Sequence, residues 1–436
     1  MGNKKVLIVT YYWPPSGGAA VQRWLSFANK LAAAGWEVHL LTVEERYATY
    51  QLRDESLISQ IDPRITVHTT RTFEPFRLYQ SLFGKNSIPK PAFANESQPS
   101  LMKKISRFIR GNFFIPDPRK GWKRFAVPKA LHLLLQHEIK NIITAGPPHS
   151  THFIGKQVKE KTNVKWIADF HDLWTDVIYY HMLYHLPQVK KYDLQLERSI
   201  LESADVVVTV GEKYRQKLLS KSPRMDPEKL KVIPIGYDEG FFEDPGNKQI
   251  RSEEFTITYT GSIADFYDPQ VLLDALKSVL PLFPSLPFTL RFVGVLSGGI
   301  KQNIIDSGLE RYLQETGYLP HQEALSFLVN SSVLLLVNPV TKDEDMVIPG
   351  KLYEYLAAQK PIINITRHTA ETATIITRCS AGKTFERQEQ ALLEEHLKGL
   401  IATWLKKGNV SLQGNEEAIA SYSRKLLADQ LAYYLD

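Results

Sequence analysis

Two glycines that follow the first apolar run of the chain could bring the backbone close to an anion. Val6–Thr10 is typical of a buried strand, and Pro14 and Pro15 end it because proline lacks an amide donor. Gly17 and Gly18 come next and permit a close approach of the backbone to a ligand. A helix behind them would direct free N–H groups to the same point, which suits a phosphate or a sugar diphosphate. The alternative is a tight turn without a ligand.

A second pair of residues that could do chemistry is His171 and Asp172. They follow the apolar run 166–170, and parallel α/β sheets bind their ligands at the carboxyl ends of strands. Both side chains could therefore meet a reacting group, although a hydrogen-bonded loop pair explains them equally well. His181 and His185 have a spacing that allows metal binding, but no glutamate motif accompanies them. Ordinary surface histidines are the better interpretation of that pair.

The segment 101–129 concentrates the positive charge of the chain. It holds nine Lys and Arg residues against one Asp, whereas the whole chain has a net charge of +6, so the remainder is slightly acidic. A helical projection gives one apolar and one basic face. The apolar face holds Leu101, Ile105, Phe108 and Ile109, and the basic face holds Lys103, Lys104, Arg107 and Arg110. A core helix with a solvated basic face and a helix that contacts anionic lipid are equally supported. Aromatic residues interleave with bases here, but no motif supports a nucleic-acid partner.

Alternating strands and helices must position these residues. Apolar runs with helical patterns between them predict a first series of strands at 6–10, 37–43, 141–144, 166–170, 206–210 and 231–235. A second series is predicted at 256–261, 288–294, 332–339 and 361–365. We therefore expect two parallel-sheet α/β domains. The first covers 1–235, a linker covers 236–253, the second covers 254–415, and a last helix covers about 416–436.

Composition excludes several classes of protein. The chain has 436 residues, is 43% hydrophobic and contains a single cysteine, Cys379, which excludes an internal disulfide framework and a cysteine-based zinc cluster. No stretch approaches the roughly 18 apolar residues of a membrane span, and the first residues lack the pattern of a signal peptide. The dinucleotide fingerprint G-x-G-x-x-G is absent after the first strand, which argues against NAD. We expect a cytoplasmic protein that is soluble or peripheral on the inner face of the cell membrane.

Several segments together resemble one enzyme family. They are "PPSGGAAVQRWLSFANKLAAAGWEVHLLT", "GPPHSTHF" followed by "WIADFHDLWTD", "KVIPIGYDEGFF", "YTGSIADFYDPQVLLDAL" and "GKLYEYLAAQKPII". As a set, and in this order, they resemble the retaining glycosyltransferases of family 4, which have the GT-B fold of two Rossmann-like domains that face a cleft. The resemblance spans nearly the whole chain and is strongest to the bacterial polysaccharide and lipopolysaccharide branch.

The resemblance implies a division of labour between the domains. The first would take a glycan or lipid-linked acceptor, the second would take a nucleotide sugar of the UDP or GDP type, and the last helix would cross back onto the first domain. It implies no cofactor. The acidic run "DED" at 343–345 fits the D-x-D motif of metal-dependent transferases of the other fold class, but the surrounding motifs do not match that class, so we expect no metal. The acceptor or membrane side would involve Arg23, Lys103, Lys104, Arg107 and Arg110.

Site residues also follow from the resemblance. Glu354 would accept hydrogen bonds from the ribose hydroxyls, because a carboxylate is all acceptor, and His171 and Asp172 would face the reacting sugar. The implied donor-binding set is Gly17, Gly18, Gly261, Ser262, Gly317, Tyr318, Leu319, Pro349, Gly350, Lys351, Leu352 and Glu354.

The chain departs from the family pattern in two places. The usual second glutamate, eight residues before Glu354, is replaced by Met346. Glu344 or Asp345, just before it, could serve in its place with a shifted loop. The usual bases after Gly261 are also absent. Lys351, at the start of a helix, is then the best cation for the diphosphate, and it would act as a catalytic residue.

We therefore predict a metal-independent, retaining glycosyltransferase. A nucleotide-sugar epimerase or hydrolase on the same fold is one alternative. A non-catalytic module of a polysaccharide assembly complex is another, since the departures could mark lost activity.

Overall fold

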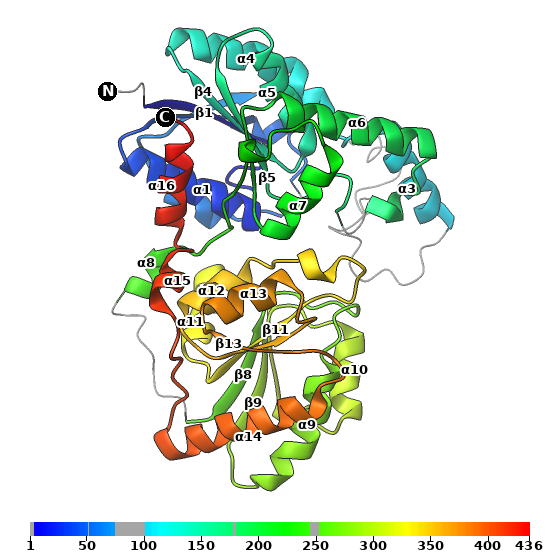
Figure 1. Cartoon of the computed structure of the whole chain (residues 1–436), viewed down its shortest axis with the longest axis vertical. Coiled ribbons are helices and arrows are strands. Elements are labelled where there is room, and N and C mark those ends of the chain that lie inside the picture. Colours follow the sequence, from blue (N-terminus) through cyan, green and yellow to red (C-terminus); the bar gives the residue numbers. More distant parts are fainter. Residues whose placement is uncertain (1–3, 51, 75–100, 178–179, 245–252) are drawn as a thin grey trace. The chain divides into compact units, whose positions relative to one another are not determined.

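The computed structural model describes residues 4–50, 52–74, 101–177, 180–244 and 253–436. Contacts within the chain divide it into two compact units, shown in Figure 1. The first comprises Met1–Ile235 together with Arg424–Asp436, and the second comprises Gly236–Ser423. Each unit is an α/β structure built on a parallel sheet, as the sequence predicts.

The first unit is organised around a sheet with the order β3-β2-β1-β4-β5-β6-β7 among its described residues. Every neighbouring pair is parallel. The strands are β1 (Lys5–Thr10), β2 (Glu37–Val43), β3 (Thr66–Thr70), β4 (Asn141–Gly146), β5 (Lys165–Phe170), β6 (Val206–Thr209) and β7 (Leu230–Val232). The inner strands are almost wholly buried because helices cover both faces of a parallel sheet.

Helices connect the strands of the first unit. They are α1 (Ala19–Ala33), α3 (Leu101–Phe113), α4 (Lys123–Gln136), α5 (His152–Lys159), α6 (Pro187–Ser203), α7 (Glu212–Lys221) and α16 (Arg424–Tyr433). The final helix α16 lies beside α1 in Figure 1, and its Leu427 and Leu431 share one hydrophobic cluster with Phe27 and Leu31 of α1. The end of the chain therefore belongs to the core of the first unit.

The second unit holds a sheet with the order β10-β9-β8-β11-β12-β13 among its described residues, again all parallel. Its strands are β8 (Phe255–Thr260), β9 (Phe288–Val293), β10 (Leu313–Gly317), β11 (Val333–Val337), β12 (Ile362–Ile365) and β13 (Gly382–Phe385). Its helices are α8 (Glu239–Glu243), α9 (Gln270–Val279), α10 (Gly298–Asp306), α11 (His321–Val329), α12 (Lys351–Ala357), α13 (Glu371–Arg378), α14 (Gln390–Lys407) and α15 (Glu416–Ala420).

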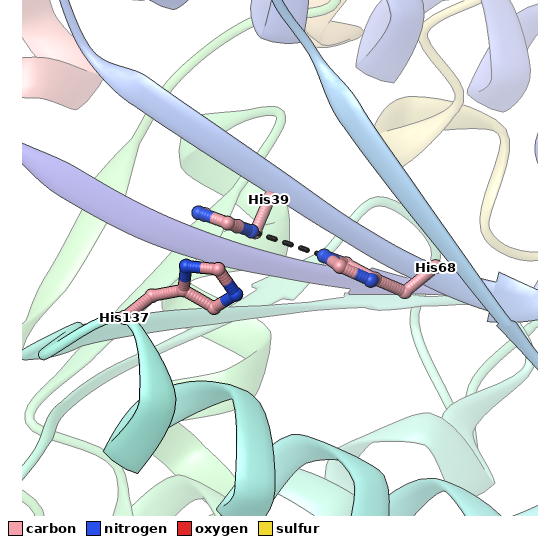
Figure 2. Close-up of side chains that lie close together, drawn as sticks. All are labelled: His39, His68 and His137. Carbon is pink, nitrogen blue, oxygen red and sulfur yellow. Dashed lines mark hydrogen bonds between the residues drawn. The ribbon is translucent and has the colours of Figure 1, made fainter.

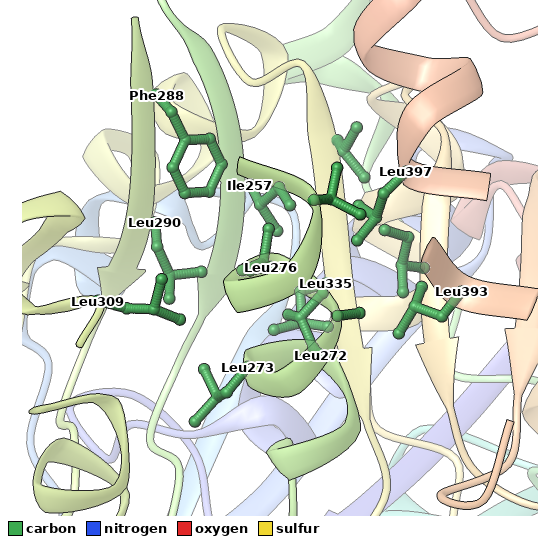
Figure 3. Close-up of a cluster of buried hydrophobic side chains, with 14 of the residues drawn as sticks. Ile257, Leu272, Leu273, Leu276, Phe288, Leu290, Leu309, Leu335, Leu393 and Leu397 are labelled. Atoms are coloured by element: carbon green, nitrogen blue, oxygen red, sulfur yellow. The ribbon is translucent and has the colours of Figure 1, made fainter. Parts of the chain in front are cut away.

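The core of the second unit lies between the sheet and the helices α9 and α14. Figure 3 shows Leu273 and Leu276 of α9 and Leu393 and Leu397 of α14 packed over strand residues such as Ile257. Burial of each such side chain contributes about 1.5–3 kcal/mol. This packing fixes the strands whose carboxyl ends carry the candidate site.

Two features differ from the sequence-based expectation. The single helix expected over about 416–436 is two helices, α15 and α16, separated by a turn at 421–423. The stretch 236–253, expected to be a linker, contains the helix α8, and its residues 245–252 lie outside the described part of the chain.

Candidate functional site

The glycine turn of the first unit opens onto a cavity. Gly18 has a φ of 113°, which favours glycine, and it precedes α1, where no side chain among the described residues caps the first turn. Gly17, Gly18 and the first residues of α1 line a cavity of about 400 Å³. The amide of Gly17 already donates to the Leu52 carbonyl at 3.1 Å. The first residues of α1 also line the cavity, and the start of a helix leaves its N–H groups without intrahelical partners.

Asp172 lines the same cavity, whereas His171 does not. Burial, and then the carboxylate of Asp169, raise the pKa of Asp172 to about 6. His171 is 8% exposed, and burial lowers its pKa to about 3, so its ring is neutral. Among the described residues its Nδ1 has no hydrogen-bond partner. The structure thus places Asp172, but not His171, at the cavity beside the glycine turn.

The environment of Arg23 contradicts the expectation that this residue lies on the acceptor or membrane side. Its side chain is 0% exposed, and its NH1 group donates to Asp169 Oδ2 at 2.6 Å while its NH2 group donates to the Ile233 carbonyl at 3.1 Å. Trp24 donates to the same carboxylate at 2.9 Å. A guanidinium enclosed in this way cannot reach an acceptor or a membrane, so Arg23 is a structural residue of the core.

The cavity also contains a histidine that sequence reasoning did not single out. His149 stacks on Trp174 with ring centroids 5.2 Å apart, and both residues line the cavity. Burial lowers the pKa of His149 to about 3. Arg119 lines the cavity as well, with its guanidinium above the rings of Tyr11 and Tyr12. The segment "GPPHSTHF" was the available signal for His149.

The second unit brings Lys351 and Gly261 together. A Cβ atom built on Gly261 would lie 3.1 Å from Lys351 Nζ, so the amino group rests against this glycine. Lys351 Nζ also lies 3.7 Å from the centre of the Tyr259 ring. Burial lowers the pKa of Lys351 to about 7, and the nearby Glu354 carboxylate partly opposes this shift. An anion bound beside Gly261 would favour the charged form of the amine.

Gly261 itself departs from the expected role. Its amide donates to the Val293 carbonyl at 2.7 Å, so that N–H is not available to a diphosphate. Gly261 has a φ of 89°, and a side chain on the facing Gly294 would collide with its backbone. Gly261 therefore provides space for the Lys351 side chain, and neighbouring Ser262 is exposed at the same edge.

Tyr355 fixes the helix that carries Lys351. Its hydroxyl accepts the Thr260 amide at 2.9 Å, which joins α12 to the carboxyl end of β8. Tyr355 and Leu352 are fully buried, and Lys351 and Glu354 lie on the partly exposed side of the helix. The expectation that Leu352 binds the donor is wrong for its side chain, because that side chain belongs to the core. Its amide donates to the Pro349 carbonyl at 3.0 Å.

Glu354 is paired with a histidine that the sequence did not highlight. His321 Nε2 donates to Glu354 Oε1 at 2.8 Å. His321 begins α11, directly after the short loop of Tyr318, Leu319 and Pro320 that follows Gly317, the last residue of β10, so this loop is anchored near Glu354. Gly317 has a φ of 69°, and Tyr318 is 80% exposed. Glu354 retains its Oε2 atom for a further donor.

The acidic stretch before Met346 has a structural role. Glu344 is 1% exposed, and its Oε1 atom accepts hydrogen bonds from Thr366 at 2.8 Å and from Arg387 at 2.9 Å. Asp345 accepts from Thr369 at 2.7 Å. The buried Glu344 cannot replace the glutamate missing at Met346.

Helix α3 exposes the apolar face predicted from its sequence. Leu101 is 72% exposed and Ile105 is 45% exposed, so the helix is not a core helix. Lys104 is exposed and Arg110 lines the 400 Å³ cavity, but Arg107 is 5% exposed, which contradicts its placement on a solvated basic face. Lys103 lies in α3, and its side chain is outside the described part of the structure.

Comparison of the sequence with known protein families adds to the geometry described above. The profile of Glycosyltransferase Family 4 matches residues 17–241, which is more than half of the chain. The chain belongs to this family. The matched range contains Gly17, Gly18, α1 and most of the residues that line the cavity, but it begins after β1 and after the lining residues Tyr12 and Ser16.

Solved structures agree on the fold of this family 4 protein. A glycosyltransferase from Rickettsia africae covers 99% of this chain and 97% of its own, with 15% identity and a TM-score of 0.63. HepE of Anabaena, solved with UDP, covers 99% of both chains, with 16% identity and a TM-score of 0.61. WaaG, a glycosyltransferase involved in lipopolysaccharide biosynthesis, covers 99% of this chain and 95% of its own, with 13% identity and a TM-score of 0.51. These similarities confirm the predicted GT-B fold.

Two further comparisons bear on this family 4 protein. No curated protein sequence matches the chain significantly. Among the helices that the structure describes, none combines the length and the hydropathy needed to cross a bilayer.

Proposed function

We propose that the chain is a retaining glycosyltransferase that moves a sugar from a nucleotide sugar to a glycan or lipid-linked acceptor, without a metal, in bacterial cell-surface polysaccharide synthesis. The observation that carries this proposal is the contact of Lys351 with Gly261 at the carboxyl edge of the second sheet, with Glu354 one helical turn away. Family membership supports glycosyl transfer, and the proposed role in polysaccharide synthesis rests on the fold it shares with WaaG.

Lys351 and Glu354 would hold different parts of one donor. Side chains three residues apart on a helix are neighbours, so an amine and a carboxylate can meet the diphosphate and the ribose of the same nucleotide. Cleavage of the glycosidic bond leaves negative charge on the diphosphate, and a fixed cation stabilises that charge. The low pKa of Lys351 fits this role, because the amine gains its full charge when an anion binds. HepE has been solved with UDP and with UDP-glucose, which makes uridine nucleotides the first donors to test.

The cavity of the first unit would hold the acceptor. Aromatic and aliphatic walls with a few polar groups are typical of sugar and small-molecule sites. Asp172 and His149 are the polar groups that we expect to contact the acceptor or the transferred sugar. Asp172→Asn should then lower turnover while the affinity for the bare nucleotide stays nearly unchanged. A large loss of nucleotide affinity would place Asp172 in the donor site instead.

Helix α3 supports a membrane role for lipid-linked acceptors. Exposed apolar side chains, together with Lys104 and the neighbouring basic segment, are typical of helices that lie on anionic lipid. We propose that the protein is cytoplasmic and contacts the inner face of the cell membrane through this helix.

One assay separates the proposed transfer from its alternatives. Purified protein is incubated with UDP-, GDP- and ADP-sugars, with and without oligosaccharide or lipid-linked acceptors, and the products are followed by mass spectrometry and NMR. We expect acceptor-dependent release of the nucleotide and a product whose anomeric configuration matches that of the donor. A new sugar nucleotide would indicate an epimerase, and acceptor-independent release a hydrolase. Stable binding without products would indicate a non-catalytic module. Undiminished transfer after exhaustive chelation supports the metal-free mechanism.

A further inference from the structure

Three histidines from distant segments meet at the edge of the first sheet (Figure 2). His39 lies in β2, His68 lies in the edge strand β3, and His137 is the C-cap residue of α4. One ring nitrogen from each lies within 4.8 Å of the other two, and His39 Nδ1 is 3.0 Å from His68 Nε2. No other group of three potential metal ligands this close occurs among the described residues.

Strand register and a helix end explain why the three rings converge. His39 pairs with Thr66 and Leu41 pairs with His68, so the two histidines are diagonal neighbours on the same face of two adjacent parallel strands. His137 ends α4 with its backbone amide bonded to Leu133, and its carbonyl accepts Lys5 Nζ at 3.0 Å. The backbone of each element therefore fixes the position from which its ring projects.

Glu37 orients the His39 ring for ligation. His39 Nε2 donates to Glu37 Oε1 at 2.9 Å, so the lone pair of the neutral ring resides on Nδ1 and faces His68. A carboxylate bonded to the outer nitrogen of a ligating histidine is the usual support in metal sites, where it fixes the tautomer and raises the basicity of the ligand. Lys5 lies 3.3 Å from the other oxygen of Glu37, which holds the carboxylate in place.

We propose that His39, His68 and His137 bind one divalent transition-metal ion of the kind that favours imidazole, with Zn²⁺ the best match. Three neutral imidazoles plus one water make a four-coordinate site, and metal–nitrogen bonds of about 2.0–2.1 Å require nitrogens roughly 3.3 Å apart. The His39–His68 separation is already close to that value, so the ion would replace their hydrogen bond after small rotations of the rings.

This site is separate from the proposed chemistry of transfer. In the pairing of β1 with β2, His39 lies opposite Leu7. Leu7 is three residues before Thr10, the last residue of β1. The glycine turn follows the carboxyl end of β1, so about 10 Å of strand separates it from the level of His39. The ion would therefore tie β2, the edge strand β3 and the end of α4 together rather than activate a substrate. A zinc ion at this site would contradict the sequence-based expectation that the chain binds no metal. It would not contradict the proposal that the transfer of the sugar itself needs no metal.

Metal binding by the untagged, full-length protein tests the proposal. After dialysis against a chelator, Zn²⁺ is titrated by calorimetry, and Co²⁺ is added to a second sample to record its visible spectrum. We expect one Zn²⁺ per chain with a dissociation constant on the order of micromolar or tighter, and the intense visible bands of tetrahedral Co²⁺. Unfolding should shift to higher temperature when Zn²⁺ is in excess.

Variants assign the binding to these residues. Glu37→Gln should weaken Zn²⁺ binding about 10- to 100-fold, and His68→Ala and His137→Ala should weaken it more. The matched control is His132→Ala, on the exposed side of α4, which should bind as the wild type does. Circular dichroism verifies that each variant is folded. Absence of Zn²⁺ binding by the wild type, or binding that survives both His68→Ala and His137→Ala, would overturn the proposal and leave a hydrogen-bonded histidine cluster.

Discussion

The segments that follow the inner strands β1 and β8 differ between the two sheets. This difference gives each unit a different kind of candidate binding site. In the first unit β1 leads into the glycine turn and α1, beside a cavity with aromatic walls and Asp172. In the second unit β8 leads to Gly261, against which Lys351 rests. An amine with a carboxylate one helical turn away suits a nucleoside diphosphate, whereas a cavity that combines aromatic walls with Asp172, Asp117, Arg110 and Arg119 suits the hydroxyl groups of a sugar. The same α/β framework thus carries two chemically distinct edges.

The largest effect should come from the buried ion pair of the first unit. Arg23→Ala leaves the carboxylate of Asp169 buried without its cation, which should lower the free energy of unfolding by about 3–5 kcal/mol. Urea denaturation measures the change. Arg64→Ala removes an exposed partner of Asp62 and, as the matched control, should leave the free energy of unfolding nearly unchanged. If Arg23→Ala is no less stable than Arg64→Ala, Arg23 is not the core residue described above.

The next largest effect should be on turnover in the second unit. In the proposed mechanism, Lys351→Ala would remove a charge-assisted hydrogen bond to the leaving group, worth about 1.5–3 kcal/mol, so kcat should fall roughly ten- to a hundredfold. Steady-state release of nucleotide from the best donor measures it. Lys342→Ala is the control, because Lys342 is an exposed lysine in the same unit. Full activity of Lys351→Ala would mean that another group meets the diphosphate.

The pH dependence of binding should also distinguish the two units. Burial lowers the pKa of Lys351 to about 7, and only the charged amine attracts a diphosphate. Affinity for a nucleoside diphosphate should therefore be highest below pH 7. It should fall by up to about tenfold per pH unit above it, until the pKa of the bound state is reached. Calorimetric titrations between pH 7 and 9 measure this, and Lys351→Met should abolish the dependence. Constant affinity over this range in the wild type would contradict the assignment.

The smallest effect should be seen at α3. Each basic side chain near an anionic bilayer contributes about 1 kcal/mol, so Lys104→Gln should weaken binding to vesicles of anionic lipid roughly fivefold. Ile105→Ser should weaken it through the apolar face. Sedimentation at low and high salt is the measurement, with Lys406→Gln, an exposed lysine of α14 in the second unit, as the control. Failure of the wild type to sediment with such vesicles at low salt would remove the membrane role.

The sequence predicted the inner strands of both sheets and missed most of the edges. Strands such as β1, β4 and β8 are buried on both faces and therefore read as continuous apolar runs. The edge strands β3, β10 and β13 have the sequences TVHTT, LQETG and GKTF, which lack such a run because one side of an edge strand meets solvent. The other edge, β7, is shorter than expected and ends at Val232.

Residues of the candidate site could be predicted from the sequence where they directly follow a recognisable strand or turn. Lys351 and Gly261 each follow a recognisable turn or strand, so their meeting could be anticipated. Arg23 could not be assigned correctly, because nothing in its helix reveals that Asp169, 146 residues later, lies opposite. The pairing of Glu354 with His321 and the convergence of the three histidines at β2 are likewise tertiary contacts between distant segments.

The most direct test of the central claim is a binding cycle in the second unit. UDP and uridine are each titrated calorimetrically into the wild type and into Lys351→Ala at pH 6.5, where the amine of the free protein is largely charged. We predict that the variant loses about ten- to a hundredfold in affinity for UDP, as expected for a charge-assisted contact, while its affinity for uridine changes less than about twofold. Equal affinities of the two proteins for UDP, or equal losses for UDP and uridine, would contradict the claim that Lys351 holds the diphosphate.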